Sequence, residues 1–422
     1  MPLPVIPNGP LRLESLRVPG SCVGQSDRLV TAALSVKDGQ FVDAASDATV
    51  VDMKGAMAFP TFVDAHVHLD KGHIWPRCPN PDGSFDGAIM SVRRDTAANW
   101  SAEDLWARMN FSLRSAYAYG TCAMRTHLDS HPPQDGISWP VFEELRNAWA
   151  GRIDLQAACL VACHYATSNA FETTADLVQK AGGVLGMVTY PNPDLDAQIE
   201  AFFDAAIARG LSADFHADET LDPEVNTVGA LAQTVLDRGF DAPVTVGHLC
   251  SLSTMAETEA LHTLDLIARA GIHVVSLPMC NLYLQDRHGA RTPRNRGTTL
   301  IHEMAARGIP VSFASDNTRD PFYAYGDLDM LELMREATRI GHLDHSVVDW
   351  TRGFLQTPAA GCGFAEPSLR PGAPADLVIC NARSWTELFA RPQSDRIVLR
   401  RGEVIDRTLP DYSELDALME KT

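Results

Sequence analysis

The sequence has little positive charge and no long apolar run. Thirty-five Lys and Arg residues stand against 54 Asp and Glu residues, which gives a formal net charge of −19. A phosphate backbone or an anionic lipid surface repels such a chain. No segment offers the roughly 18 uninterrupted apolar residues of a membrane span, and the first residues lack the basic and apolar parts of a secretory signal. We therefore predict a cytoplasmic protein that binds neither nucleic acid nor membranes.

The nine cysteines form no C-x-x-C pair and are odd in number. Cys159, Cys250 and Cys280 lie in apolar runs typical of buried strands or strand ends. This pattern excludes a cysteine-rich zinc site and gives no support for a disulfide framework. We expect most of the cysteines to be reduced residues of the core.

The composition is that of a folded chain with a sizeable core, because 45% of the 422 residues are hydrophobic and 21% are charged. Apolar, β-branched runs alternate with stretches of helical period, which predicts an α/β fold with a (β/α)₈ TIM barrel. The eight predicted strands are 58–66, 121–127, 153–161, 183–189, 213–216, 244–248, 273–277 and 310–316. The predicted helices are 102–118, 141–150, 174–181, 196–209, 226–238, 255–270 and 300–307.

Both ends of the chain differ from the middle in their residue pattern, because short apolar runs alternate there with turn residues. Residues 396–405 resemble a hairpin around Gly402. Strands too few to bury a face alone must pair with others. We therefore predict that 1–58 and 371–422 build one small composite β domain, and that 59–370 form the barrel.

Polar residues stand at the ends of five predicted strands. In a parallel barrel all carboxyl ends of strands open on one face, so these side chains should meet at one mouth. They are His66 and His68, His127 and Asp129, His216 and Glu219, His248, and Asp316.

His66 and His68 form an i, i+2 pair, and an extended strand sends both imidazoles to the same side. With His216 and Asp316 they make three nitrogens and one oxygen. That set suits Zn²⁺ or Fe²⁺ and leaves a position for water. A single strand histidine is more often a hydrogen-bonded core residue, but four ligand-type residues at equivalent strand ends favour a metal site.

Five segments carry a resemblance to the amidohydrolase superfamily, and most closely to its cytosine deaminase branch. They are 59–70 (FPTFVDAHVHLD), 125–129 (RTHLD), 215–219 (FHADE), 246–248 (VGH) and 313–317 (FASDN). The resemblance implies that His66, His68, His216 and Asp316 are the metal ligands. It further implies that Glu219 shuttles protons, that His248 steers the hydrolytic water, and that Asp316 takes up the proton of that water.

Binuclear members of the superfamily carry a carbamylated lysine at the end of the fourth strand. The matching segment here, 186–190 (GMVTY), has no lysine. We therefore expect one divalent ion, Zn²⁺ or Fe²⁺.

Three positions depart from the residues with which similar deaminases bind cytosine. Ala162, Asn317 and Phe322 stand where those enzymes have glutamine, aspartate and tryptophan. An alanine cannot make the two polar contacts of an amide, and a pocket built around such contacts loses its discrimination without them. A larger ring such as a pterin, an aminotriazine or a modified pyrimidine is therefore favoured over cytosine.

Other candidate substrate-binding residues are polar. Asn281 and Gln285 are candidate readers of a ring edge, and Lys71 follows the first barrel strand. Arg287 lies in 281–296, which we expect to be a loop with four arginines. One of them either binds an acidic ring substituent or pairs with carboxylates of neighbouring loops.

The predicted function is a metal-dependent hydrolytic deaminase that releases ammonia from an amino-substituted N-heterocycle. The same site chemistry also allows cleavage of a cyclic amide or of an N-alkylamino C–N bond. A third interpretation is an inactive metal-binding scaffold. The expected partner is a small heterocyclic substrate, and a homo-oligomer is possible.

Overall fold

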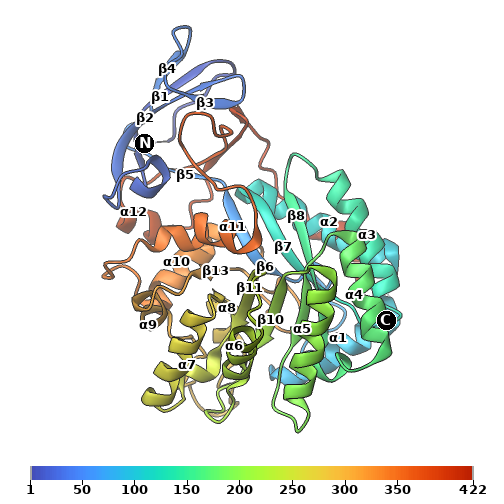
Figure 1. The fold of residues 1–422 in the computed structure, drawn as a ribbon. Helices are drawn as coiled ribbons and strands as arrows, with labels where there is room; N and C mark the ends of the chain where they lie inside the picture. The colour runs from blue at the N-terminus through green and yellow to red at the C-terminus, as the bar shows by residue number, and fades with distance from the viewer. Residues whose placement is uncertain (1, 421–422) are drawn as a thin grey trace.

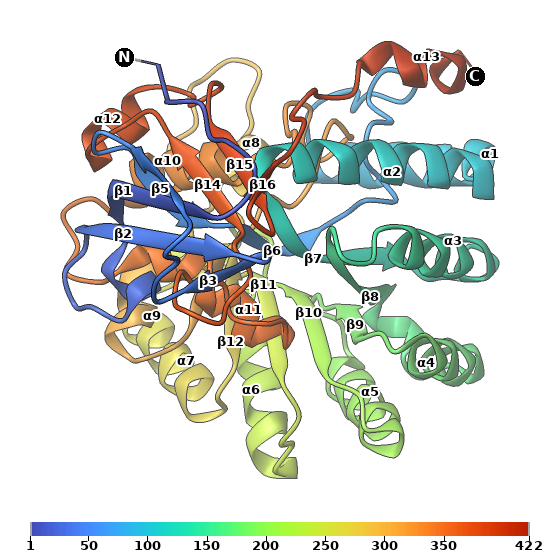
Figure 2. The same ribbon diagram turned by 90° about the horizontal axis from the view of Figure 1, so that it is seen from above.

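The computed structural model describes residues 2–420, and its centre is a barrel of eight parallel strands (Figures 1 and 2). This confirms the predicted barrel. The strands are buried on both faces, which is why each appears in the sequence as a continuous apolar run. They are β6 (Phe62–Val67), β7 (Thr121–Asp129), β8 (Asp154–Ala162), β9 (Leu185–Val188), β10 (Ala213–Ala217), β11 (Val244–His248), β12 (His273–Ser276) and β13 (Val311–Phe313).

The barrel closes between its first and last strands. Val67 bridges Asp316 in parallel register, the Asp316 amide donates to the His66 carbonyl at 2.9 Å, and the His68 amide donates to the Asp316 carbonyl at 3.2 Å. Closure therefore brings three predicted metal ligands together, although 248 residues separate His68 from Asp316 in the sequence.

All seven predicted helices are present in the ring around the barrel (Figure 2). The local signals are ordinary ones: the Ser101 hydroxyl caps the start of α2, and Gly120 ends it with a φ of 100°. The helices are α2 (Ala102–Tyr119), α3 (Asp135–Ala148), α4 (Asn169–Ala181), α5 (Leu195–Arg209), α6 (Thr227–Arg238), α7 (Glu257–Arg269) and α9 (Ile301–Ala306).

Several further helices have no counterpart in the prediction. Helix α1 (Phe85–Asn99) lies between the first two barrel strands. Helix α8 (Pro278–Leu284) covers the start of the segment 281–296 that was expected to be a loop, so that expectation is wrong for residues 281–284. The others are α10 (Met330–Gly341), α11 (Gln356–Cys362), α12 (Trp385–Ala390) and α13 (Asp416–Met419).

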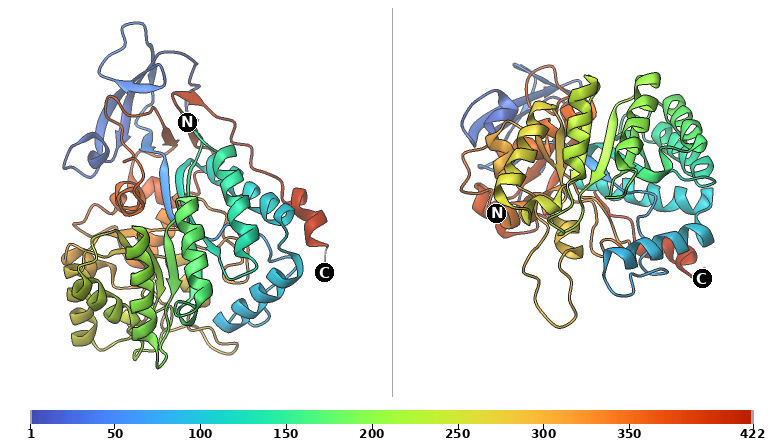
Figure 3. Two further views of the ribbon diagram at one scale, coloured as in Figure 1. Left: turned by 45° about the vertical axis from the view of Figure 1, so that its right-hand side comes forward. Right: turned by 60° about the horizontal axis from the view of Figure 1, so that its bottom comes forward.

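Strands from both ends of the chain form a second, mixed sheet beside the barrel, as predicted (Figures 1 and 3). The two ends join where β5 pairs antiparallel with β14. The predicted strand 58–66 is two strands, because β5 ends at Pro60 in this sheet and β6 begins at Phe62 in the barrel. The members are β1 (Leu11–Val18), β2 (Val30–Lys37), β3 (Gln40–Val42), β4 (Thr49–Asp52), β5 (Met57–Pro60), β14 (Leu377–Cys380), β15 (Ile397–Arg400) and β16 (Glu403–Val404).

The last described residues leave this sheet and return to the barrel, where α13 lies beside α1 and α2 (Figures 2 and 3). The Leu418 carbonyl accepts a hydrogen bond from Arg77, and Arg114 pairs with Glu414. Among residues 2–420, no helix combines the length and the apolar character that crossing a membrane requires.

Candidate active site

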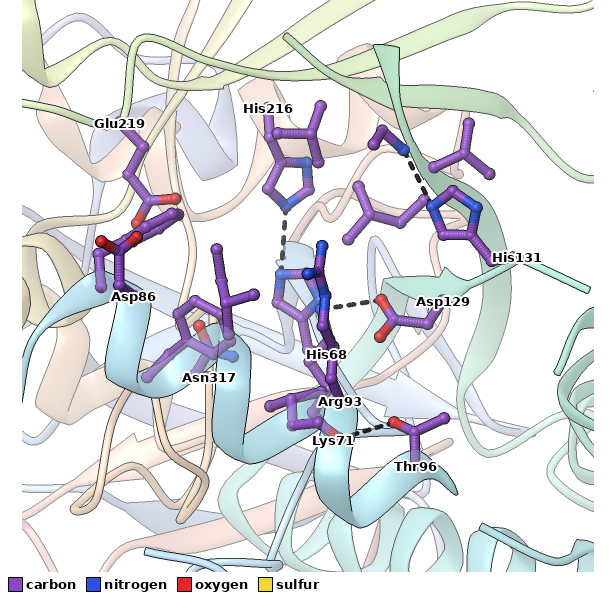
Figure 4. A pocket seen from close by; sticks show the side chains of 18 of the residues that line it. His68, Lys71, Asp86, Arg93, Thr96, Asp129, His131, His216, Glu219 and Asn317 are labelled. Carbon is purple, nitrogen blue, oxygen red and sulfur yellow. Dashed lines mark hydrogen bonds and ion pairs between the residues drawn. The ribbon is translucent and has the colours of Figure 1, made fainter. Parts of the chain in front are cut away.

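The four predicted ligands meet at the carboxyl end of the barrel. The Nε2 atoms of His68 and His216 are 3.2 Å apart, and His68 Nε2 lies 3.3 Å from Asp316 Oδ1. His66 Nε2 lies 3.6 Å from the same oxygen. All four side chains are buried. Figure 4 shows His68 and His216 pointing toward one another across the site.

These three distances are close to those between the ligands of a divalent ion. Asp316 also lies in a group with His66 and His248, whose ligand atoms are all within 4.8 Å of one another. Four ligands placed tetrahedrally about 2.05 Å from zinc lie about 3.3 Å from one another. Within residues 2–420, both ring nitrogens of His66 and both carboxylate oxygens of Asp316 are buried without a hydrogen-bond partner. Buried polar atoms are normally paired, so this group of atoms has the character of a coordination site.

The histidines of this site are neutral, as metal ligands must be. Burial and the neighbouring imidazoles lower the pKa of His66 and of His216 well below the usual value. Burial and the Lys71 ammonium do the same to the pKa of His68. Their lone pairs are therefore available to a cation at neutral pH.

A fourth imidazole belongs to the cluster. One nitrogen each of His66, His68, His127 and His216 lie within 4.8 Å of one another. Sequence reasoning found His127 at its strand end but gave it no role in the site. Its Nε2 is 2.9 Å from Asp214 Oδ1. Alternation along β7 and β10 allows this contact, but the sequence alone does not predict it.

Glu219 follows His216 by three residues and faces His248. Its Oε1 lies 3.4 Å from His248 Nδ1 and accepts a hydrogen bond of 3.2 Å from the Asn281 amide nitrogen. Burial and the nearby Asp316 raise the pKa of Glu219 well above its ordinary value. A carboxyl group whose pKa is raised in this way holds its proton more firmly than an ordinary glutamate and can serve as a general acid.

The Asn281 amide also sets the state of His248. Its nitrogen donates to His248 Nδ1 at 3.0 Å, and burial together with His127 lowers the pKa of His248 to about 3. The imidazole is therefore neutral and carries its hydrogen on Nε2. That Nε2 is buried and has no acceptor in the described part of the chain, which leaves it free to donate to a reacting oxygen.

The backbone that presents these groups is bent at the strand ends. His248 and Asp316 have positive φ values of 77° and 64°. Such conformations raise the free energy of a non-glycine residue, so they are found where surrounding contacts hold the backbone in place. In the loop that carries Glu219, the Asp218 carboxylate accepts from the Thr227 amide at 2.8 Å and the Thr227 hydroxyl at 2.6 Å.

A cavity of about 1340 Å³ opens above the candidate ligands. Helix α1 forms one wall with Phe85, Ile89, Arg93 and Thr96, and loops after the barrel strands form the rest (Figure 4). Five of the predicted substrate-binding residues line the cavity, namely Lys71, Ala162, Gln285, Asn317 and Phe322.

Three of these five side chains have polar partners. The Asn317 amide nitrogen donates to Asp320 at 2.7 Å. The Lys71 ammonium pairs with Asp129 at 3.0 Å and lies 5.6 Å from the centre of the Phe322 ring. Burial lowers the pKa of Lys71, but Asp129 and Asp70 outweigh it and raise the pKa, so the cation persists. The Gln285 side chain donates to the Glu219 carbonyl at 3.3 Å.

The two remaining candidates lie outside the cavity lining. Asn281 stands behind Glu219 and His248, as described above. Arg287 stacks on the Tyr283 ring, 4.3 Å from its centre, and donates to the Tyr283 carbonyl. Arg291 is paired with Asp286 in its own segment, and the Arg287 side chain also packs against Gly83 before α1.

Fold and site together define a (β/α)₈ metallohydrolase with a histidine and aspartate centre. A model described as the amidohydrolase family matches residues 158–406, and the chain belongs to that family. It is 52% identical over 417 residues to the pterin deaminase of Rhizobium rhizogenes (strain K84 / ATCC BAA-868), covering 96% of this chain and 95% of that protein.

Solved structures share the whole architecture. The 5-methylcytosine deaminase from Klebsiella pneumoniae, liganded with 5-fluorocytosine, superposes with a TM-score of 0.81 at 23% identity, covering 95% of this chain and 98% of the other. The N-isopropylammelide isopropylaminohydrolase from Burkholderia multivorans superposes with a TM-score of 0.74 at 23% identity, covering 94% and 98%. At these identities the likeness concerns the fold.

Proposed function

We propose that this protein is a metal-dependent hydrolytic deaminase whose substrate is a pterin. The observation that carries the proposal is the 52% identity to a pterin deaminase along 96% of the chain. The cavity of about 1340 Å³ supports it, because it leaves room for a fused two-ring system. Ala162 supports it as well, since it replaces a larger amide that similar deaminases use to bind a single ring.

The overall reaction adds water to a ring carbon that carries an amino group, breaks the exocyclic C–N bond and leaves a carbonyl and ammonia. Protonated Glu219 gives its proton to the ring nitrogen beside that carbon, which makes the carbon more electrophilic. The Nε2 hydrogen of His248 orients the attacking oxygen. Asp316 accepts one proton of the water, and the other stays on the new hydroxyl group. Glu219, now a carboxylate, takes the hydroxyl proton as the carbonyl forms and passes it to the departing amine, which leaves as ammonia. The proton on Asp316 then returns to Glu219 and restores the acid.

We propose that one divalent ion, Zn²⁺ or Fe²⁺, is held by His66, His68, His216 and Asp316. When bound, such an ion lowers the pKa of a water molecule toward about 7 and so supplies a nucleophile at neutral pH. The absence of lysine from residues 185–190 supports a single ion.

Substrate recognition is assigned to the cavity wall. The Lys71 and Asp129 pair offers a donor and an acceptor 3.0 Å apart, which suits the oxo and N–H groups along the edge of an amino-oxo heterocycle. Asn317 and Gln285 supply further polar contacts, and the Phe322 ring stacks on the substrate. Arg287 and the other arginines of its loop receive no substrate role.

An ammonia-coupled assay of pterin, cytosine and aminotriazines tests the proposal directly. We expect turnover of pterin to exceed that of cytosine, and Ala162→Gln to shift the ratio toward the smaller ring. Glu219→Gln should slow ammonia release by about 10²- to 10⁴-fold, whereas the exposed loop variant Glu224→Gln should not change it. Preference of the parent for cytosine, or release of an alkylamine and no ammonia from an N-alkylamino ring, contradicts the proposal.

A further inference from the structure

Beneath the four-imidazole cluster lies a buried polar group that the mechanism does not use. Asp214 precedes His216 by two residues on β10, and Arg125 precedes His127 by two on β7, so alternation directs all four side chains into the barrel. Asp214 Oδ1 is 2.9 Å from His127 Nε2, and Asp214 Oδ2 accepts from Arg125 at 2.8 Å. Asp214 and His127 are each 0% exposed.

The hydrogen on His127 is fixed by this contact. The other oxygen of the Asp214 carboxylate accepts from the Arg125 guanidinium at 2.8 Å, a charge-assisted hydrogen bond that pairs the carboxylate with a permanent cation. The carboxylate can only accept, and His127 Nε2 must therefore carry the hydrogen that it donates. His127 cannot rotate away without leaving a buried charge with one partner fewer.

The held ring is wedged among the candidate ligands. The centre of the His127 ring lies 4.0 Å from that of His66, 4.7 Å from that of His216 and 5.3 Å from that of His68. These are contact distances between aromatic rings. A shift of His127 would therefore move His66 and His216 as well.

Metal-binding histidines are usually oriented by a hydrogen bond from their second ring nitrogen. Over residues 2–420, the Nδ1 atoms of His66, His68 and His216 are all buried without such a partner. In the four-imidazole cluster, His127 is the ring that a carboxylate holds. Packing against His127 is thus the contact by which the protein can fix the His66 and His216 rings.

We propose that the Asp214–His127 pair is a positioning unit for the metal cage, which sets the ligand rings without coordinating the ion. The inference rests on the proposed metal dependence. In this proposal, packing against His127 orients the ligand rings, a function that hydrogen bonds to the second ring nitrogen have in most metal sites.

The test compares His127→Asn and Asp214→Asn with His273→Asn. His273 is a matched control, because it is another barrel histidine with a polar partner, Ser312 at 2.9 Å, and it stands at the first residue of β12, at the opposite end of the barrel. Three quantities are measured on each purified protein: the Zn²⁺ dissociation constant by chelator competition, the thermal unfolding midpoint, and the number of nitrogen ligands by X-ray absorption.

We expect His127→Asn and Asp214→Asn to weaken Zn²⁺ binding by about 10- to 100-fold with the nitrogen count unchanged. His273→Asn should lower the unfolding midpoint while its Zn²⁺ affinity stays within about twofold of the parent. Unchanged affinity in both site variants overturns the inference, and so does loss of one nitrogen ligand in His127→Asn, which makes His127 a ligand. Failure of the parent itself to bind a divalent ion instead overturns the proposed function.

Discussion

Replacing Gly247 by alanine should weaken metal binding, because this glycine makes room for a candidate ligand. A Cβ at Gly247 on β11 would lie 2.9 Å from His66 Cε1 and 3.1 Å from His66 Nδ1. Comfortable contact between such atoms needs about 3.5 Å, so the imidazole must move by about half an ångström. Metal sites tolerate about 0.2 Å in a ligand distance, which is less than this displacement.

The magnitude follows from the cost of overpacking a close-packed interior, which is about 1–3 kcal/mol. If His66 must return to its place to bind the ion, the binding reaction carries this cost. At about 1.4 kcal/mol for each factor of ten, the dissociation constant rises by about 5- to 150-fold. Competition of the purified protein with a chromogenic chelator measures it.

Gly136→Ala provides the control, because a Cβ at Gly136 on α3 meets no atom within 4 Å. Its metal affinity should equal that of the parent, and its helix should gain slight stability. If both variants are folded and bind the metal with equal affinity, the prediction is refuted and His66 is not a metal ligand.

Three further outcomes are expected. Removing divalent ions by dialysis against a chelator should abolish ammonia release. It should also lower the unfolding midpoint, because an ion present at a thousand times its Kd stabilises the folded protein by about 4 kcal/mol. Unchanged turnover of a sample that metal analysis shows to be depleted would contradict this prediction. Glu219→Gln should reduce kcat by about 10²- to 10⁴-fold, while substrate affinity measured by equilibrium binding changes little. A loss of affinity as large as the loss of kcat would show that Glu219 binds the substrate rather than transferring a proton. Asp104→Ala should lower the free energy of unfolding in urea by about 3–5 kcal/mol, because the buried guanidinium groups of Arg77 and Arg108 both contact the Asp104 carboxylate. A decrease below about 1 kcal/mol would show that these ion pairs contribute little to stability.

The barrel was predictable from sequence because its strands are buried on both faces and end in polar residues. Helix α1 was not, for a physical reason. Its buried positions include Gly87, Ser91 and Asp95, because the helix lies over a cavity and over polar partners. Asp95, for example, pairs with Arg77 and accepts from the Trp100 indole at 2.8 Å. A helix that buries small and polar side chains carries no apolar period to detect.

The site was predictable where strand geometry determines it and unpredictable where loops do. His66, His68, His216 and Asp316 meet because barrel closure and strand alternation leave them no alternative. Asn281 could be proposed as a polar residue, but its contact with Glu219 and His248 depends on the seven-residue helix α8, which a proline starts. The His127 contact with Asp214 likewise depends on the pairing of side chains across the barrel interior.

Different parts of the fold determine activity and substrate preference. His248 and Asp316 stand at strand ends held by the barrel's own hydrogen bonds, as when the Asp316 amide donates to the His66 carbonyl. Glu219, the proposed proton shuttle, follows β10 in a short loop that Asp218 ties to Thr227. The cavity wall opposite them is built from α1 and from loops, whose side chains can change without disturbing that ladder. A substitution such as Ala162→Gln should therefore alter which ring is accepted while the chemical step survives. Substitutions beneath the candidate ligands, at Gly247 or Asp214, should instead impair every substrate to the same degree, because they act through the proposed metal cage that all substrates would share.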